Sequence, residues 1–219
     1  MCPPAHDVAT ELVGHYQDCF LKHGRTPQGV DWPNAEDLAT RFQVMLGVIR
    51  PGDGRVSILD LGCGPGLLAD YLAKSPRPAP IDYRGIDLSA PMLESARAAW
   101  PDLVFEQRDI LAEPLAPQSV DYVILNGVLT ERVSVPRDDM IAFATDLLAG
   151  AFAAARVGIA FNVMSKLVDW EREDLFHWGF DEMAAALAPR LSRHLTIRAD
   201  YGLREYTTYI HREPAAQGV

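Results

Sequence analysis

The sequence has few cysteines, and none of them are paired by spacing. Its 219 residues include three, Cys2, Cys19 and Cys63, and no two of them have the C-x-x-C spacing. An odd number without this spacing argues against a disulfide framework and against a cysteine zinc site. The histidine spacings H-x-x-x-H and H-E-x-x-H are also missing. We therefore expect reduced thiols and no bound metal.

Positive charge and long apolar runs are scarce as well. The sequence has 20 Lys and Arg and 30 Asp and Glu, which gives a formal charge of -10. This negative charge disfavours binding to the phosphate backbone of a nucleic acid. The charge-free stretch in the most apolar region, residues 147–155, is far shorter than the roughly 20 residues of a membrane span. The N-terminus shows no basic and apolar export signal. We expect a cytoplasmic protein with no nucleic-acid partner and no membrane span.

The first 54 residues are expected to form a helical cap. Apolar residues recur at helical spacing from Val8 to Phe20, and Asn34 is placed to cap a second helix that ends before Pro51. The stretch between them, 25–33, is rich in proline and glycine and is typical of a loop. The sequence predicts a helical lid over residues 1–54 and a core over residues 55–219, together forming one compact unit.

From residue 55 onward, short apolar runs alternate with helical stretches. Strands are expected at 56–61, 81–87, 103–109, 120–126 and 156–162, and helices at 66–74, 91–99 and 138–154. Such near-continuous apolar strands are typical of a parallel sheet covered on both faces. Two β-prone runs, 195–201 and 205–212, predict a closing antiparallel hairpin. The fold class is α/β: a doubly wound, mostly parallel sheet of seven strands.

A glycine-rich turn follows the first expected strand. Gly62, Gly64 and Gly66 have the spacing G-x-G-x-G, with the small Cys63 inside it. Without Cβ atoms, such glycines let a ligand lie against the main chain. A dinucleotide site would more typically have a glycine at the position of Leu67. The loop predicts a nucleoside ligand of another kind.

Carboxylates stand at the ends of three successive expected strands. They are Asp60, Asp87 and Asp109. Asp87 lies about 20 residues beyond the glycine loop, where an acid can accept hydrogen bonds from ribose hydroxyls. Asp109 can accept from an adenine amino group while Ile110 covers the ring. Because ligands of open α/β sheets bind at the carboxyl ends of strands, the three acids should point at one crevice.

The glycine loop and these acids resemble the class I S-adenosylmethionine-dependent methyltransferases, from about residue 56 through the final hairpin. The resemblance implies a Rossmann-like core that binds S-adenosylmethionine and releases S-adenosylhomocysteine. It also implies the ligand contacts: the methionine part on Asp60, Gly62, Cys63, Gly64, Gly66 and Asn126, the ribose on Asp87 with Leu88, and the adenine on Asp109 with Ile110.

Methyl transfer from a sulfonium depends mainly on alignment, so no catalytic motif is obligatory. Glu131, beyond the fourth strand, is a candidate base, although it can instead pair with Arg132. His177 is a candidate acid or base. The candidate acceptor contacts are Tyr16, His23, Asp31 and Trp32 in the cap and Asn162 at the end of the fifth strand. The expected partner is a small-molecule acceptor methylated on O or N, and the chain is expected to be a monomer or homodimer.

Three other functions stay open at this point. The same cofactor can be cyclised or cleaved at its aminobutyrate arm, which releases methylthioadenosine. The chain can also be a non-catalytic cofactor-binding partner of another subunit. A nicotinamide dehydrogenase is disfavoured by Leu67 and by the third acid, Asp109.

Overall fold

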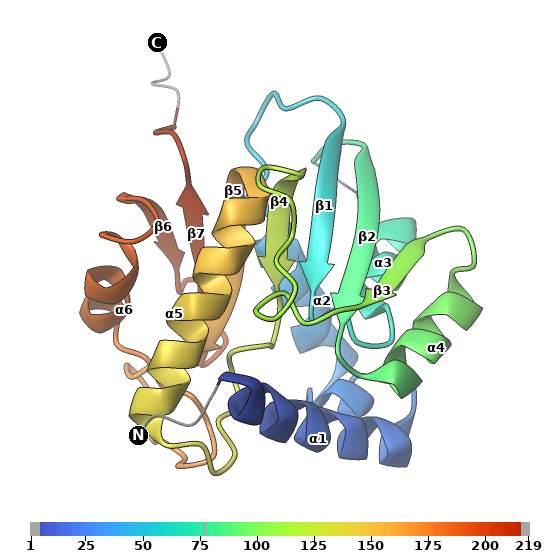
Figure 1. Ribbon diagram of the computed structural model, residues 1–219, viewed down its shortest axis with the longest axis horizontal. Coiled ribbons are helices and arrows are strands. Elements are labelled where there is room, and N and C mark those ends of the chain that lie inside the picture. The colour runs from blue at the N-terminus through green and yellow to red at the C-terminus, as the bar shows by residue number, and fades with distance from the viewer. Residues whose placement is uncertain (1–4, 77, 216–219) are drawn as a thin grey trace.

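Seven strands form a single sheet in the order β3-β2-β1-β4-β5-β7-β6 (Figure 1). The computed structural model describes residues 5–76 and 78–215. Strands β1 to β5 pair in parallel, and β7 runs antiparallel to β5 and to β6. The predicted fold class is confirmed. The strands are β1 (Val56–Leu61), β2 (Ile81–Asp87), β3 (Val104–Gln107), β4 (Val120–Leu125), β5 (Ala155–Met164), β6 (His194–Arg198) and β7 (Glu205–His211).

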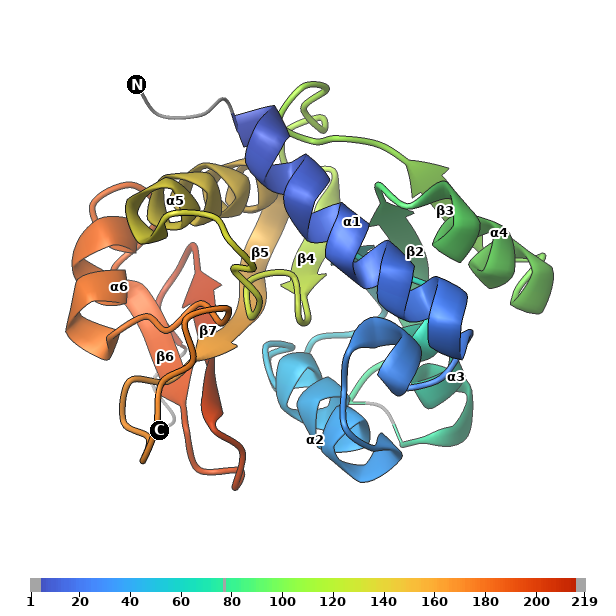
Figure 2. The same cartoon turned by 90° about the horizontal axis from the view of Figure 1, so that it is seen from below.

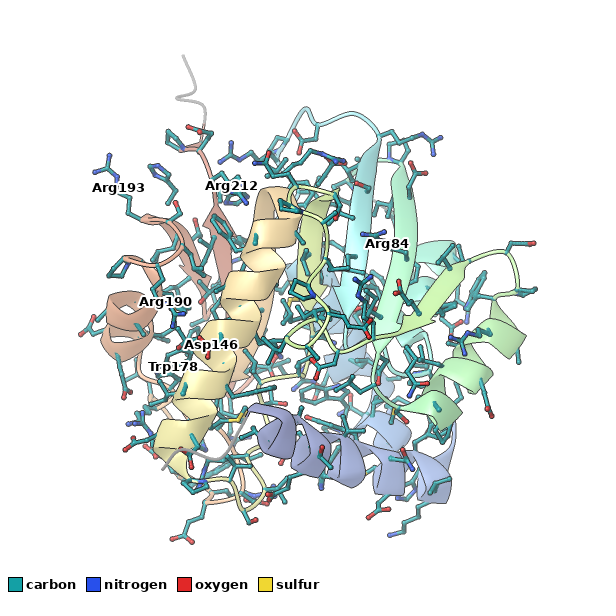
Figure 3. The ribbon with its side chains drawn as sticks, in the orientation of Figure 1. Arg84, Asp146, Trp178, Arg190, Arg193 and Arg212 are labelled. Carbon is teal, nitrogen blue, oxygen red and sulfur yellow. The ribbon has the colours of Figure 1, made fainter. Side chains whose placement is uncertain are left out.

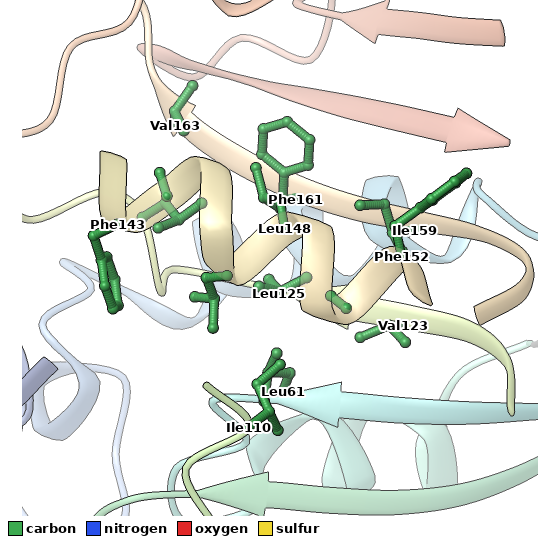
Figure 4. Close-up of a cluster of buried hydrophobic side chains, with 14 of the residues drawn as sticks. Leu61, Ile110, Val123, Leu125, Phe143, Leu148, Phe152, Ile159, Phe161 and Val163 are labelled. Carbon is green, nitrogen blue, oxygen red and sulfur yellow. The ribbon is translucent and has the colours of Figure 1, made fainter. Parts of the chain in front are cut away.

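Helices cover both faces of this sheet. They are α1 (Ala5–His23), η1 (Gln28–Val30), α2 (Ala35–Leu46), α3 (Leu67–Lys74), α4 (Ala90–Ala99), α5 (Arg137–Ala154) and α6 (Phe180–Leu187). On one face α5 packs its apolar side chains, among them Phe143 and Leu148, against β4 and β5 (Figure 4). On the other face α2 and α3 pack against alternate residues of β1 and β4, such as Ile58 and Tyr122. Both faces of the central strands are therefore buried, as their apolar runs predict.

The elements differ from the prediction at several places. Strand β3 ends at Gln107, so Asp109 lies in the turn after it, and β5 continues to Met164. Helix α6 was not predicted, although it buries Met183 and Leu187 in the same cluster as α5. At its far end Arg190 forms an ion pair of 2.9 Å with Asp146 of α5 (Figure 3). The short α6 is thereby held against α5.

The N-terminal helices lie where the sequence predicts them. The Asn34 side chain accepts a hydrogen bond of 2.8 Å from the backbone N–H of Asp37 and so caps α2. Seen from below, α1 crosses the carboxyl ends of the parallel strands (Figure 2). Its residues Val8, Ala9 and Leu12 are buried in the same cluster as the core strands. Among the described helices, none is both long and apolar enough to cross a membrane.

A buried polar chain connects α2 to the sheet. Arg41 Nε donates to both carboxylate oxygens of Glu205 on β7, at 3.0 and 2.9 Å, and their side chains are only 7% and 1% exposed. Asn162 on β5 donates to the same carboxylate at 2.9 Å and accepts a 2.8 Å bond from the N–H of Gly127. The guanidinium carbon of Arg41 also lies 3.7 Å from the centre of the Trp32 ring. One ion pair therefore links the cap, two strands and the turn after β4.

Replacing Glu205 by Gln should lower the free energy of unfolding by about 3–5 kcal/mol, because it leaves the Arg41 charge buried without a counter-charge. Urea unfolding measures this. The control is Asp82→Asn, which breaks an ion pair with Arg55 whose side chains are 59% and 66% exposed and should cost less than about 1 kcal/mol. Equal losses in the two variants would contradict the role of the buried pair.

Candidate active-site cavity

A cavity lies at the carboxyl ends of β1, β2 and β4, beneath α1. Its volume is about 150 Å³, far more than the volume that a single water molecule needs. The sheet contributes the glycine loop and the segments after β2, β3 and β4, and the cap contributes residues of α1 and α2. The structure places Asp60, Asp87 and Asp109 along this one cavity, as the strand ends predict.

The glycine loop needs its glycines. Gly62, Gly64 and Gly66 have φ angles of +79°, +52° and +79°, which L side chains rarely adopt. A Cβ on Gly62 would lie 2.3 Å from Cγ2 of Val128, on the turn after β4. The loop is fixed further by Asp87, whose Oδ2 accepts a 2.7 Å hydrogen bond from the N–H of Gly64. The backbone of the glycine loop is therefore fixed in a conformation in which it lines the cavity.

The residues that line the cavity carry negative charge. The described wall residues include three aspartates but no Lys, Arg or His. Burial raises the pKa of Asp60 to about 7, although the side chain accepts a 2.8 Å hydrogen bond from the Tyr83 hydroxyl. Burial also raises the pKa of Asp87, against the lowering effect of the backbone N–H groups of Ser89 and Gly64. A cationic ligand would relieve both carboxylates, whereas an anionic ligand would be repelled.

One side-chain oxygen of the wall has no hydrogen-bond partner among the described residues. Asn126, the residue after β4, lines the cavity, and its buried side-chain oxygen accepts no hydrogen bond. A buried acceptor left in this state costs about 1–3 kcal/mol. A ligand that brings an N–H or O–H donor to this point recovers that energy, so the atom fits a site for a polar ligand group.

The cap closes the cavity with Tyr16 and Trp32. The Tyr16 hydroxyl donates to the carbonyl oxygen of Gly127 at 2.7 Å and lies 3.3 Å from the Thr130 hydroxyl. Burial, with a smaller effect of Glu131, raises the pKa of Tyr16, so this hydroxyl keeps its proton. The Trp32 ring lies so close to Gly127 that a Cβ there would be 2.8 Å from Cζ2. Tyr16 and Trp32, two of the four cap residues predicted to contact the acceptor, therefore contact the turn after β4.

Three predicted acceptor contacts do not reach the cavity. His23 is exposed on the last turn of α1, past the point where the helix covers the site. Asp31 is exposed and points to His15, whose Nε2 lies 2.8 Å from its carboxylate. Asn162 is fully buried, with both ends of its amide bound by Gly127 and Glu205. The expectation that Asn162 faces the crevice is wrong, because the amide positions the turn from behind.

The two predicted catalytic side chains also lie off the cavity wall. His177 is buried beside a separate hollow, with Nδ1 donating to the Ser165 carbonyl at 2.7 Å and Nε2 accepting from the Arg172 N–H at 3.4 Å. Both ring nitrogens are thus used by backbone groups. Glu131 is 9% exposed and forms a β-bridge with Leu175. Burial, then the charge of Asp31, raises its pKa to about 7.

Sequence reasoning missed most of the apolar wall. These residues come from five helices and from the turn that follows Asp109: Ala9, Leu12, Val13, Leu38, Phe42, Leu68, Met92, Leu111, Phe143 and Leu147. On the helices they belong to apolar stripes that are also expected of ordinary core residues. Only Leu111 had a local signal, since it directly follows the predicted Asp109 and Ile110.

Comparisons with known proteins agree with this fold. Residues 58–151 match the family described as the methyltransferase domain. A Mycobacterium tuberculosis protein provisionally named a methyltransferase is 31% identical over 161 residues, which cover 71% of this chain and 93% of that protein. The trans-aconitate 2-methyltransferase of an Azoarcus species is 40% identical over 80 residues, which are 36% of this chain and 30% of that enzyme.

Solved structures share the architecture at low sequence identity. The DhpI-SAM-HEP complex matches with a TM-score of 0.62 and 17% identity, covering 96% of this chain and 100% of that chain. At this identity the likeness extends to the fold alone.

Replacing Gly127 by Ala should both strain the turn and push Trp32 away. The left-handed backbone, φ +83°, costs roughly 1–2 kcal/mol for a residue with a Cβ. Gly52→Ala is the matched control, since Gly52 has a φ of +88° and no atom lies within 4 Å of the place that a Cβ would take there. Urea unfolding should show a larger loss for Gly127→Ala than for Gly52→Ala. Indistinguishable losses would mean that Trp32 does not pack tightly on the turn.

Proposed function

Since the chain belongs to the class I S-adenosylmethionine-dependent methyltransferases, we propose that it transfers the sulfonium methyl group to an oxygen or nitrogen atom of a small molecule and leaves S-adenosylhomocysteine. One observation carries the proposal: a cavity whose described wall has three carboxylates and no basic side chain. S-adenosylmethionine brings a sulfonium and an ammonium to such a wall. The pyrophosphate of a nicotinamide dinucleotide would bring negative charge.

The residues present fit the parts of this cofactor. Asp87 already accepts backbone hydrogen bonds from Gly64 and Ser89, and a carboxylate has further lone pairs for ribose hydroxyls. We assign the adenine to the side of the cavity with Asp109, Ile110 and the apolar Leu88.

We assign the methionine part to the other end of the glycine loop. Asp60 supplies a carboxylate for the ammonium group, and the unpartnered oxygen of Asn126 supplies an acceptor. Gly62 and Gly64 allow the main chain to approach the ligand closely. Cys63 is buried and its thiol pKa is raised, so it acts as a small wall residue and not as a nucleophile.

The chain's own contribution to the reaction is alignment and exclusion of water. The sulfonium supplies an activated methyl group, so the acceptor must be held in line with it. Tyr16 and Trp32 close the cavity over the turn after β4. Tyr16 keeps its proton and can donate a hydrogen bond, but it cannot remove a proton from the acceptor. We infer that no dedicated base of the cap takes the acceptor's proton, which is lost to bulk solvent after methyl transfer, when the cavity opens.

The wall next to this turn indicates the class of acceptor. Val30, Trp32, Leu38 and Phe42 line it from the cap, and they offer apolar and aromatic surface. Trans-aconitate, the substrate in the name of the Azoarcus enzyme, carries carboxylates that need cationic partners. We therefore propose a neutral, largely apolar acceptor for this chain.

Calorimetric titration with S-adenosylmethionine, S-adenosylhomocysteine and NAD, followed by mass spectrometry of the products, tests the function. We expect the first two to bind, the cofactor to stay intact with the protein alone, and S-adenosylhomocysteine to form with neutral aromatic acceptors. Tighter binding of NAD would overturn the proposal. Formation of methylthioadenosine without an acceptor would replace it by cyclase or lyase chemistry.

Replacing Asp87 by Ala should weaken S-adenosylhomocysteine binding roughly ten- to hundredfold. This is the worth of charge-assisted hydrogen bonds, about 1.5–3 kcal/mol. Asp82→Ala is the control, because Asp82 lies on the same strand and its side chain is 59% exposed beside Arg55. Calorimetry of both variants measures the difference, and equal affinity in the two would remove Asp87 from the binding site.

S-adenosylmethionine affinity should depend on pH through Asp60. Its pKa in the folded protein, about 7, is above the ordinary value, so the side chain is protonated and neutral below pH 7. The ligand's ammonium stays charged below about pH 8. Affinity should therefore fall as the pH falls from about 7.5 to 5.5. Asp60→Asn should bind weakly with a flat profile over this range, and an unchanged slope in that variant would assign the pH dependence to another group.

A further inference from the structure

The outer side of the lid carries a second cluster of polar side chains, away from the cavity. His15 and Cys19 are four residues apart on α1 and so share one face of the helix. Asp31 reaches them from the residue after η1, where it has a left-handed φ of +59°. His15 Nε2 lies 2.8 Å from the Asp31 carboxylate and 4.0 Å from Cys19 Sγ. One ligand atom of each lies within 4.8 Å of the other two.

A fourth side chain makes the cluster more negative. Glu131 is only 9% exposed. Burial, then the charges of Asp31 and Glu131, raises the pKa of the Cys19 thiol. Two carboxylates therefore act on the cluster.

The geometry points to a site for a divalent transition-metal cation of the zinc type, held by His15, Cys19 and Asp31. Imidazole, thiolate and carboxylate together are the ligand types of zinc, whereas calcium and magnesium select oxygen atoms. Ligand atoms of a tetrahedral zinc site are about 3.5 Å apart, as bond lengths of roughly 2.0–2.3 Å require. Small side-chain rotations bring the observed 2.8 and 4.0 Å separations to this value.

Binding is an exchange of protons for a cation, without redox chemistry. The Cys19 thiol loses its proton to solvent as the sulfur–metal bond forms. The His15–Asp31 hydrogen bond is replaced by two bonds to the metal. His15 and Cys19 are partly exposed and Asp31 is exposed, so a cation can enter from solvent. The expectation of no bound metal rested on missing histidine pairs and cysteine pairs, whereas this cluster has the mixed H-x-x-x-C spacing.

The site joins the two parts of the lid. Tyr16 follows His15 directly and Trp32 follows Asp31 directly, and both line the cavity. A cation held between the helix and the loop therefore fixes the two residues that close the cavity over Gly127. The inference does not depend on the acceptor or on methyl transfer, because the cluster is defined by its own side chains.

Titration of the chelator-treated, reduced chain with Co²⁺ tests the site. All proteins carry Cys2→Ser, so that Cys19 and the buried Cys63 are the remaining thiols. We expect one Co²⁺ per chain, with a thiolate-to-cobalt charge-transfer band, visible absorption typical of tetrahedral cobalt, and displacement by Zn²⁺. Absence of the charge-transfer band at saturating Co²⁺ would overturn the inference.

Three variants locate the ligands. Cys19→Ser should abolish the charge-transfer band, and His15→Gln and Asp31→Asn should each weaken Co²⁺ binding by at least about 100-fold, since even the partners of metal ligands are worth 10–100-fold. His194→Gln, on β6, is the matched control and should bind as the parent does. A band that persists in Cys19→Ser, or equal binding in all variants, would place the metal elsewhere.

Thermal unfolding gives a second readout that does not rely on spectra. Zn²⁺ should raise the unfolding temperature of the parent and of His194→Gln, because a ligand bound only by the folded state stabilises it. It should leave Cys19→Ser and His15→Gln unchanged, while their unfolding without metal stays close to that of the parent. Equal shifts in every protein would mean nonspecific binding and would contradict the site.

Discussion

The buried ion pair between Arg41 and Glu205 is the interaction on which the geometry of the site depends. It joins α2, near the start of the chain, to β7, near its end, at full burial. Asn162 extends it to the N–H of Gly127, and the Trp32 ring stacks on the guanidinium. A charge pair in this position is costly to form in a low-dielectric interior, and it is stable only with well-placed hydrogen bonds. Those hydrogen bonds set the turn that faces the cavity.

The cavity wall differs from this ion pair, because its carboxylates are not matched by basic side chains in the described wall. Asp60 is buried and Asp87 is partly buried, the described wall has no cationic side chain, and desolvation raises the pKa of both carboxylates. Such an arrangement destabilises the empty fold, and groups perturbed in this way cluster at functional sites. A cationic ligand removes the imbalance, so binding and folding are linked through the same carboxylates. The Arg41–Glu205 ion pair is neutral as a pair and therefore does not offset the negative charge of the cavity wall.

Much of the fold could be predicted from the sequence because its signals are local. The glycine loop, the strand positions and the Asn34 cap each depend on a few neighbouring residues, and Asp60, Asp87 and Asp109 follow from their place at or after strand ends. The direction of a side chain beyond a strand is not a local property. Asn162 was expected in the cavity, yet it turns to Glu205, a residue 43 positions away. His177 was expected to do chemistry, yet backbone groups bind both of its ring nitrogens.

The lid shows why neighbouring residues can have unrelated surroundings. On α1, Tyr16 points into the cavity while His15 points to the outer cluster, because successive helical residues are rotated by about 100°. The same division holds in the loop, where Trp32 packs on Gly127 and Asp31 faces His15. Because Asp31 and Trp32 are adjacent in the sequence, both were predicted to contact the acceptor, although only Trp32 lines the cavity. Because both segments carry one residue on each side, any force that draws His15 and Asp31 together also positions Tyr16 and Trp32. The outer cluster and the cavity are thus mechanically connected through two pairs of adjacent residues.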